Sequence, residues 1–270
     1  MPELSIIVLT WNTSEITKKC VLSIKRSLEN KIDYEIIVAD NGSTDNTQQV
    51  FKDLKFVKYI KLSKNYGFSK GNNLAAKYAK GKYILFLNSD MELLNSRLID
   101  MLRHIKLNPI IGLIGPKFLN VDQSPQGSVF PPQTITNAFR EFWLGQKSYS
   151  KYTPATDKPI EVWAVSGGAV IIDRSLFEKI GGWDTRYFMF YEDLELCRQI
   201  KKLNYKIFFY PQCSLVHHHG ASGKNLASNI NQWRRLIPSS KIFHGLARHF
   251  LINSTIWSGQ KYQKIKRLFG

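Results

Sequence analysis

Cysteine is scarce in this sequence of 270 residues, which has only 3, none of them close to another along the chain. This odd, scattered set excludes a disulfide framework and a CxxC metal site, and it is typical of a reducing compartment. No apolar run approaches the roughly 18 residues that a membrane-spanning helix needs. The start of the chain has no basic segment, and its apolar run Leu4–Leu9 is too short for a signal peptide. We therefore expect a cytoplasmic protein.

Acidic residues are absent from the last part of the chain. Glu195 is the last one, and 13 of the 38 Lys and Arg residues follow it, in a protein with a formal net charge of +17. This concentration of positive charge favours anionic partners, which include nucleic acid, phosphates and an anionic membrane surface. The alternative is a solvated basic surface that only aids solubility.

The remaining composition is ordinary, with 43% hydrophobic and 22% charged residues. This excludes a disordered or collagen-like chain, and the length allows one large domain or two small ones. Apolar, β-branched runs alternate with helical patterns in the first half. The expected strands are Leu4–Thr10, Tyr34–Ala39, Phe56–Leu62 and Lys82–Leu87, and the expected helices are Ser14–Leu28 with Ser14 as N-cap, a short one from Thr44, Ser69–Ala79 and Asn95–Leu107.

This alternation predicts an α/β fold with a mostly parallel central sheet and helices on both faces. Polar clusters follow the expected strand ends, where open α/β sheets bind ligands. The prolines between 121 and 159 predict a long loop with one helix near Thr136–Leu144. After it we expect strands at Val162–Val165, Ala169–Ile172 and Tyr205–Tyr210 and helices at Ser175–Ile180 and Glu192–Leu203. Beyond Gly220 the sequence looks helical, basic and aromatic.

Three clusters could carry chemistry. Asp90 follows a strand end in Asn88-Ser89-Asp90, where a carboxylate can hold Mg²⁺ or Mn²⁺ on a diphosphate, or simply cap a turn. Glu192 and Asp193 open a helix, where a carboxylate can act as a general base or merely complement the helix dipole. Of the consecutive histidines from His217, at most two share a face of a strand, and one could complete an oxygen-rich metal site.

A fourth cluster is the glycine- and amide-rich run Asn65–Asn73, which allows close backbone approach to an anionic ligand. It matches neither GxGxxG nor the Walker loop, so the corresponding nucleotide-binding folds lack their fingerprints.

Taken in order, these pieces resemble the family 2 glycosyltransferases of the GT-A fold, especially the rhamnosyltransferase-like branch that builds bacterial surface polysaccharides. The resemblance covers about residues 4 to 222. The matching stretches are Ser5–Asn12, Ile36–Asp45, Asn65–Asn73, Leu87–Asp90, Ser166–Ala169, Ile180–Asp184, Phe190–Cys197 and Val216–Ser222. It implies a GT-A catalytic domain over 1–222, with a nucleotide-binding half (1–120) and an acceptor-binding half (121–222), followed by a basic aromatic helical extension (223–270).

The resemblance also implies roles for single residues. The nucleotide-binding positions would be Thr10, Asn12, Asp40, Ser43, Asn65, Gly67, Asn72, Asn88 and Ser89. Asp90 would hold a divalent cation, Mn²⁺ or Mg²⁺, with His217 as a late ligand. Asn88 departs from the family pattern, which has an acid there, and this weakens the expected dependence on metal. Asp193 would be the catalytic base, with Glu192 as support. The acceptor side would include Gly167, Gly168 and Trp183.

The implied reaction is a single inverting displacement from a UDP- or dTDP-linked sugar to a hydroxyl of a saccharide or lipid-diphosphate-linked acceptor. The basic, aromatic end then predicts contact with the anionic inner face of the cell membrane, although these residues could instead pack on the catalytic domain or form a dimer interface. A sugar nucleotidyltransferase is the main alternative. A nucleic-acid-binding protein is a weaker one, because no recognised binding motif is present, and we expect no nucleic-acid partner.

Overall fold

The structure is a computed structural model that describes residues 1–218 and 229–269. Within these residues lies a 10-stranded sheet, and its main path has the order β3-β2-β1-β4-β11-β6-β12-β5. These strands are β3 (Val57–Lys61), β2 (Tyr34–Asp40), β1 (Leu4–Thr10), β4 (Tyr83–Asn88), β11 (Ala169–Asp173), β6 (Ile111–Leu119), β12 (Lys206–His217) and β5 (Met91–Leu93). Off this path, β7 (Pro125–Gln126) pairs with β6 and β9 (Ile160–Glu161) with β12, while β8 (Val129–Phe130) and β10 (Ala164–Val165) form a separate pair.

The strands of the first half are parallel, as predicted. β1 pairs in parallel with both β2 and β4, and β2 pairs in parallel with β3. The second half is mixed, because β11 runs antiparallel to both β4 and β6 while β12 runs parallel to β6. Parallel neighbours bring Thr10 directly beside Asp40, so the polar clusters that follow these strands meet at one edge of the sheet.

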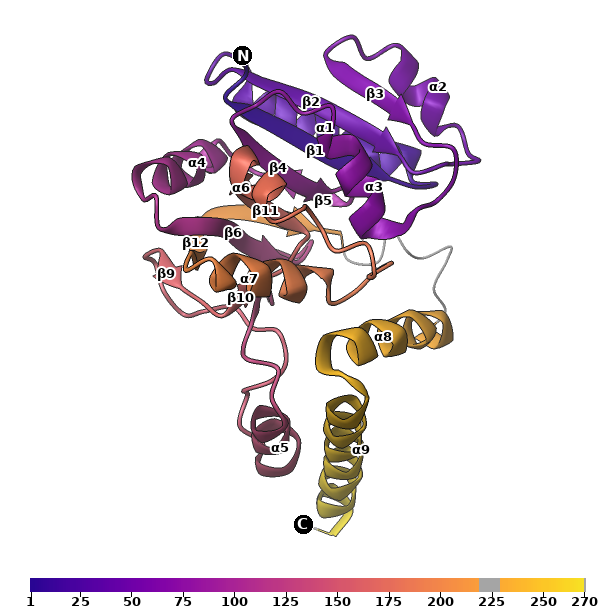
Figure 1. The fold of residues 1–270 in the computed structure, drawn as a ribbon, viewed down its shortest axis with the longest axis vertical. Helices are drawn as coiled ribbons and strands as arrows, with labels where there is room; N and C mark the ends of the chain where they lie inside the picture. The colour runs from indigo at the N-terminus through magenta and orange to yellow at the C-terminus, as the bar shows by residue number, and fades with distance from the viewer. Residues whose placement is uncertain (219–228, 270) are drawn as a thin grey trace.

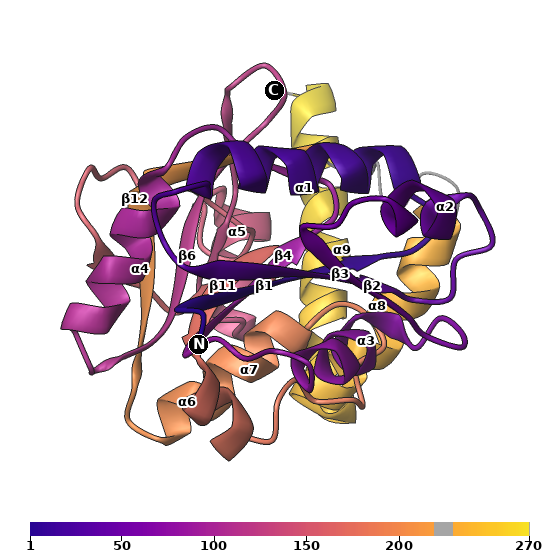
Figure 2. The same cartoon turned by 90° about the horizontal axis from the view of Figure 1, so that it is seen from above.

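Helices cover both faces of the sheet, as Figure 2 shows. The helices are α1 (Ser14–Leu28), α2 (Thr47–Lys52), α3 (Gly67–Ala76), α4 (Arg97–Leu107), α5 (Ile135–Leu144), α6 (Arg174–Lys179), α7 (Glu192–Lys202), α8 (Asn229–His244) and α9 (Leu246–Phe269). Successive β1 residues serve opposite faces. Ile6 and Val8 join the core that α1 and α4 cover, whereas Ile7 joins the core under α3, α6 and α7. This division explains why the buried strands are apolar throughout.

The strand β6 was not predicted from the sequence, because glycine and proline interrupt its apolar run. Gly115 is required there, since a Cβ atom would lie 2.9 Å from the Val165 side chain. The predicted strand Tyr205–Tyr210 continues to His217, with an irregularity between Tyr210 and Ser214. Ser14 is not the N-cap of α1 but its first residue, and its hydroxyl donates to Asn46 instead.

The C-terminal helices pack on the rest of the molecule. In α8, the Ser239 hydroxyl donates to the Met189 carbonyl at 2.8 Å. α9 lies beside α5 below the sheet in Figure 1, and Ile252 on α9 is buried. Among the residues that the structure describes, no helix is long and apolar enough to cross a membrane. The last part of the predicted motif Val216–Ser222, including His219, lies outside the described residues.

Candidate active site

The predicted nucleotide-binding residues meet where β1 and β2 end. The Asp40 carboxylate accepts from the Ser43 backbone N–H at 2.7 Å and from the Tyr59 hydroxyl at 2.5 Å. The Asn12 backbone N–H in turn donates to the Ser43 hydroxyl at 2.9 Å. Thr10 is buried, and its hydroxyl lies 2.7 Å from that of Thr17. Asp40 and Thr10 therefore order this corner, in which Ser43 is also buried and Asn12 is half-buried.

A residue outside the predicted set, Asn41, joins this corner to the amide-rich loop. Its side-chain amide donates to Asn65 Oδ1 at 3.0 Å and to the Gly67 carbonyl at 3.1 Å, and its Oδ1 accepts from the Tyr66 backbone N–H. Asn41 stands in the polar run after β2, but only its contacts distinguish it from its neighbours. It is buried and holds the loop rather than facing a ligand.

The loop itself closes tightly on a distant segment. Gly67 has a φ of +80°, and a Cβ atom there would lie 2.5 Å from the Phe188 carbonyl oxygen. The Phe68 backbone N–H donates to that oxygen at 2.8 Å. Asn72, by contrast, is buried, and its amide donates to the Phe68 carbonyl of its own helix. The loop thus contacts the segment that leads into α7.

Asp90 and His217 lie together, as predicted. The turn between β4 and β5 places Asp90, and the antiparallel pairing of β12 with β5 sets His217 opposite Met91. His217 Nε2 is 3.4 Å from Asp90 Oδ1, and His217 Nδ1 is 2.6 Å from Gln126 Oε1. His218 points elsewhere, with its Nε2 3.3 Å from Glu92 Oε2. The geometry therefore favours His217 over His218 as the partner of Asp90.

These residues fit a divalent cation that binds a diphosphate. The Asp90 side chain is 2% exposed and its carboxylate faces an imidazole, a pair of ligands that suits Mn²⁺ when phosphate oxygens and water complete the shell. In the described part of the chain, no cluster of three or more His, Cys, Asp or Glu residues could hold a metal by itself. A site here would therefore depend on the donor's phosphates.

The two acids at the start of α7 differ in their surroundings. Asp193 accepts from the Gly167 backbone N–H at 3.2 Å and from the Leu194 backbone N–H at 2.9 Å. Glu192 is 8% exposed, and its burial, together with the neighbouring charge of Asp193, raises its pKa to about 8. Burial beside Asp193 therefore favours the neutral form of Glu192.

Two adjacent glycines connect the Asp193 side to the Asp90 side. Gly167 donates to Asp193, while the Gly168 carbonyl accepts from the Asn88 backbone N–H at 2.8 Å. A Cβ atom on Gly168 would lie 2.7 Å from the Met91 side chain. The predicted base and the predicted metal-binding turn thus lie on either side of one dipeptide.

The Trp183 ring packs against Gly167 of this dipeptide. It is 1% exposed, and a Cβ atom on Gly167 would lie 3.3 Å from its ring. Asn73 holds it in place, because its amide donates to the Trp183 carbonyl at 2.7 Å and accepts from the Trp183 backbone N–H at 2.9 Å. Any part that Trp183 has on the acceptor side is therefore indirect.

The comparison with protein families decides the identity. A model described as glycosyl transferase family 2 matches residues 5–181. The chain belongs to glycosyl transferase family 2. A second model, the N-terminal domain of galactosyltransferase, matches residues 147–219. This family 2 protein is thus a glycosyltransferase and not the alternative nucleotidyltransferase.

Several curated relatives are similar to this glycosyltransferase. The rhamnosyltransferase WbbL of Escherichia coli is 24% identical over 98% of both chains. An N-acetylglucosaminyl-diphospho-decaprenol L-rhamnosyltransferase of Mycobacterium tuberculosis is 24% identical over 84% of this chain and 80% of its own length. The O-antigen biosynthesis protein RfbC of Myxococcus xanthus is 27% identical over 82% of this chain, but this match spans only 18% of that much longer protein.

A solved structure has the same fold. The crystal structure of GalNAc-T7 with UDP, GalNAc and Mn²⁺ superposes on this chain with a TM-score of 0.67 and a sequence identity of 17%. The superposition covers 81% of this chain and 43% of that one. This likeness establishes the predicted GT-A fold of the family 2 protein.

Proposed function

We propose that the protein transfers a sugar from a UDP- or dTDP-linked donor to a hydroxyl of a saccharide or lipid-diphosphate-linked acceptor, with inversion, for cell-surface polysaccharide. The name of the mycobacterial relative, an N-acetylglucosaminyl-diphospho-decaprenol L-rhamnosyltransferase, supports the lipid-diphosphate acceptor class, and the name of the Escherichia coli relative supports sugar transfer. The observation that carries the proposal is the Gly167-Gly168 dipeptide, which joins the Asp193 carboxylate to the strand end that bears Asp90. We place the reaction in the cytoplasm, at the inner face of the cell membrane.

In this mechanism Asp193 accepts the proton of the attacking hydroxyl. Its carboxylate is oriented by the backbone N–H groups of Gly167 and Leu194, and a base fixed in this way suits proton transfer in the transition state. The neutral Glu192 beside it keeps a second negative charge away from the base. Asp90 and His217 would hold the divalent cation, which supplies charge neutralisation for the departing nucleoside diphosphate. Asn12, Ser43 and the loop from Asn65 would contact the nucleotide.

The substitution Asp193→Asn tests this assignment. We expect transfer to fall about 10²- to 10⁴-fold, because general-base catalysis is lost. Binding of UDP or dTDP with Mn²⁺, measured as a rise in melting temperature, should persist, because a ligand that binds only the folded state stabilises it.

The matched control is Asp157→Asn, which changes an exposed carboxylate and should leave transfer unchanged. An equal loss of nucleotide affinity in Asp193→Asn would contradict the base assignment. The released small molecule is a second readout. A glycosyltransferase releases nucleoside diphosphate, so release of pyrophosphate would contradict the proposed function. Retention of DNA or RNA at physiological salt would point to a nucleic-acid partner for the basic end.

A further inference from the structure

The helices α5 and α9 form one unit at the end of the molecule opposite the sheet. The Trp143 indole N–H of α5 donates to the Thr255 carbonyl of α9 at 3.1 Å, and the Gln263 amide donates back to the Trp143 carbonyl at 2.8 Å. The Trp143 ring also stacks on Tyr262, with centroids 5.2 Å apart. A Cβ atom on Gly259 would lie 2.8 Å from Phe142, so the helices pack closely.

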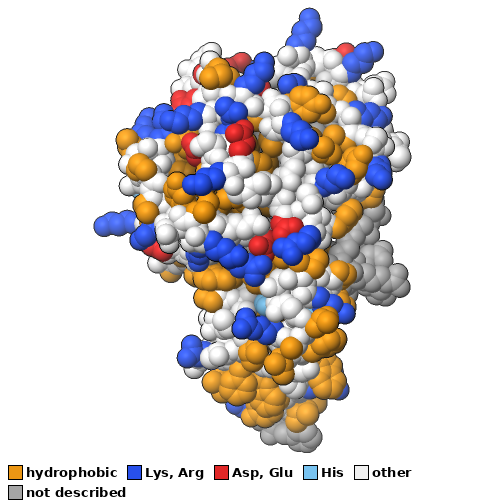
Figure 3. All heavy atoms as spheres, viewed as in Figure 1, with side chains coloured by type: hydrophobic (Ala, Val, Ile, Leu, Met, Phe, Trp, Pro, Cys, Tyr) orange, Lys and Arg blue, Asp and Glu red, His pale blue; other side chains and the backbone are white. Residues whose placement is uncertain are grey.

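The outer side of this unit exposes large apolar side chains, each 37% to 71% exposed. They are Ile135, Phe139 and Leu144 of α5 and Leu246, Phe250, Leu251, Trp257, Tyr262, Ile265 and Leu268 of α9. We call this set the apolar tip. In Figure 3 it appears as the concentration of hydrophobic atoms at the lower end of the molecule. A contiguous apolar surface on a soluble domain marks an interaction site.

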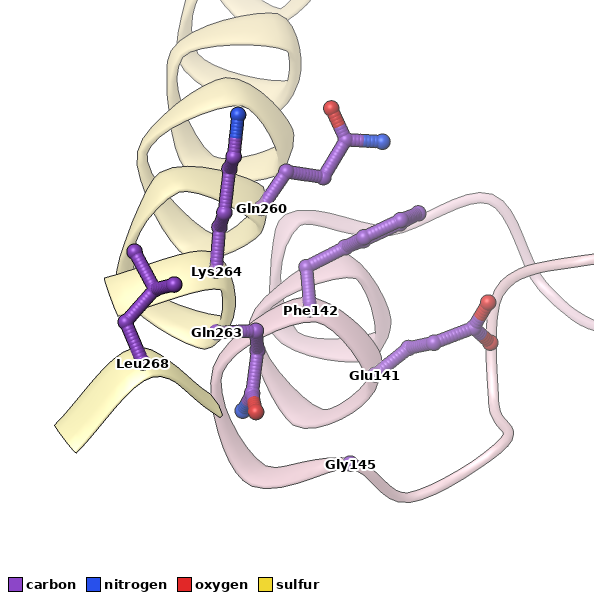
Figure 4. Close-up of a pocket in the computed structure, with 7 residues that line it drawn as sticks. All are labelled: Glu141, Phe142, Gly145, Gln260, Gln263, Lys264 and Leu268. Atoms are coloured by element: carbon purple, nitrogen blue, oxygen red, sulfur yellow. The ribbon is translucent and has the colours of Figure 1, made fainter. Parts of the chain in front are cut away.

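Basic residues lie within the same surface. In α9 the order Leu246, Phe250, Trp257, Lys261, Lys264 and Leu268 advances in steps of three, four or seven residues and so follows one helix face. The Lys261 ammonium lies 3.9 Å from the centre of the Trp257 ring. A hollow of about 580 Å³ separates the ends of α5 and α9, and Phe142, Lys264 and Leu268 line it, as Figure 4 shows.

Acidic side chains are nearly absent from this unit. α9 has none, and Glu141 is the only one in α5. Its carboxylate accepts from the backbone N–H groups of Ser148, Tyr149 and Ser150, so it serves the following turn. Within residues 135–144 and 246–269 the surface therefore combines apolar and cationic groups with a single carboxylate, that of the half-buried Glu141, which lines the hollow beside Lys264 but is engaged by the following turn.

We infer that the apolar tip docks on an anionic lipid bilayer, with its aromatic and aliphatic side chains in the headgroup region and its lysines at the lipid phosphates. Trp, Phe and Leu beside Lys are typical of helices that lie in a membrane interface. A second copy of the chain fits less well. In a two-fold interface the same surface meets itself, so Lys261 and Lys264 would face like charges with no acid to pair them.

The docking surface deepens the proposed function and rests on it, because a lipid-diphosphate acceptor is presented at such a bilayer. The segment after α5 and the helix α8, which both adjoin the apolar tip, contact Tyr191, the residue before Glu192. The Tyr149 side chain, shortly after α5, lies close to that of Tyr191, and Phe243 of α8 packs on the Tyr191 ring with centroids 5.3 Å apart. Docking would thus bring the acceptor side of the site to the membrane.

Vesicle binding of the full chain tests the inference. We expect binding to vesicles of phosphatidylcholine with phosphatidylglycerol and much weaker binding to phosphatidylcholine alone. The double variant Phe250→Ser/Trp257→Ser should bind at least about tenfold more weakly, because two large apolar side chains no longer enter the interface. Lys261→Gln/Lys264→Gln should lose about 30-fold in affinity for the anionic vesicles only, since each cation contributes about 1 kcal/mol near such a surface.

The matched control is Leu107→Ser/Ile110→Ser, which removes exposed apolar side chains at the end of α4 and should bind as the unaltered chain does. Melting curves check that each variant is folded. Equal binding by the tip variant, equal loss in the control, or no binding of the unaltered chain to anionic vesicles would overturn the inference. So would a dimer in sedimentation that the tip variant abolishes while vesicle binding stays unchanged.

The outcomes also separate this inference from the proposed function. If the chain binds anionic vesicles through the tip but releases no nucleoside diphosphate from any UDP- or dTDP-sugar, the docking surface stands and the proposed function fails. If it releases nucleoside diphosphate but ignores vesicles, only the docking surface fails.

Discussion

At the scale of single residues, the most unusual group is Glu192. Its carboxyl is buried next to Asp193, which raises its pKa from 4.5 to about 8. Between these two pH values the folded chain binds a proton that the unfolded chain has released. The free energy of unfolding of the chain therefore falls as the pH rises between these two values.

The variant Glu192→Gln should remove that loss of stability, because a neutral amide replaces the buried acid. At about pH 8 we expect the variant to be more stable than the unaltered chain by at least about 1 kcal/mol, with the difference shrinking toward about pH 5. Urea unfolding at both pH values measures it. Glu178→Gln, which changes a side chain that is 62% exposed, is the control, and a pH-independent difference in Glu192→Gln would contradict the argument.

At the scale of elements, α8 holds the segment that leads into α7, the helix that bears the proposed base. Phe190 and Tyr191 both have positive φ values, +71° and +66°, which non-glycine residues adopt only when their surroundings require it. Those surroundings come from α8, whose Ser239 hydroxyl donates to the Met189 carbonyl. Phe243 packs between Tyr191 and the Arg198 guanidinium, which lies 4.8 Å from its ring.

Phe243→Ala should therefore lower the turnover of donor by about tenfold or more, because a small displacement of the proposed base, Asp193, is costly. Affinity for the nucleoside diphosphate should change little, since no residue proposed to bind the nucleotide touches Phe243 in the described contacts. Ile242→Ala, on an exposed neighbour in the same helix, is the control. Steady-state rates and nucleotide titrations distinguish the two effects, and unchanged turnover in Phe243→Ala would show that α8 is not needed for positioning.

At the scale of the whole molecule, the predicted boundary at residue 222 separates parts that pack together. A chain that ends there loses the burial of Ile252 and the contacts of Trp143 with α9. We expect its melting temperature to fall by about 2 °C or more, the effect of losing at least 1 kcal/mol in a domain of this size. A chain that ends at residue 266 should melt nearly as the full chain does. Equal melting of all three chains would support 1–222 as an independent domain.

The sequence predicted which residues lie together at the candidate site better than it predicted what each of them contacts. Asp90 and His217 do lie together, and Asp193 lies beside Gly167. Asp40 and Thr10, however, are mainly engaged with their own neighbours, and Asn41 was missed although it stands between two predicted residues. A motif shows which side chains meet at a strand end, but hydrogen-bond partners from distant segments decide which of them face a ligand.

Local patterning alone predicted the parallel half of the sheet and the helices on its two faces, and the resemblance of ordered sequence stretches predicted the family. Apolar runs and turn residues act between near neighbours, and they are visible in the chain itself. The tertiary structure decided the strand β6, the choice of His217 over His218, and the joining of α5 with α9. Each of these depends on contacts between segments far apart along the chain, as when Gly115 makes room for Val165 and Trp143 bonds to Thr255. Such contacts leave no periodic signal in the sequence.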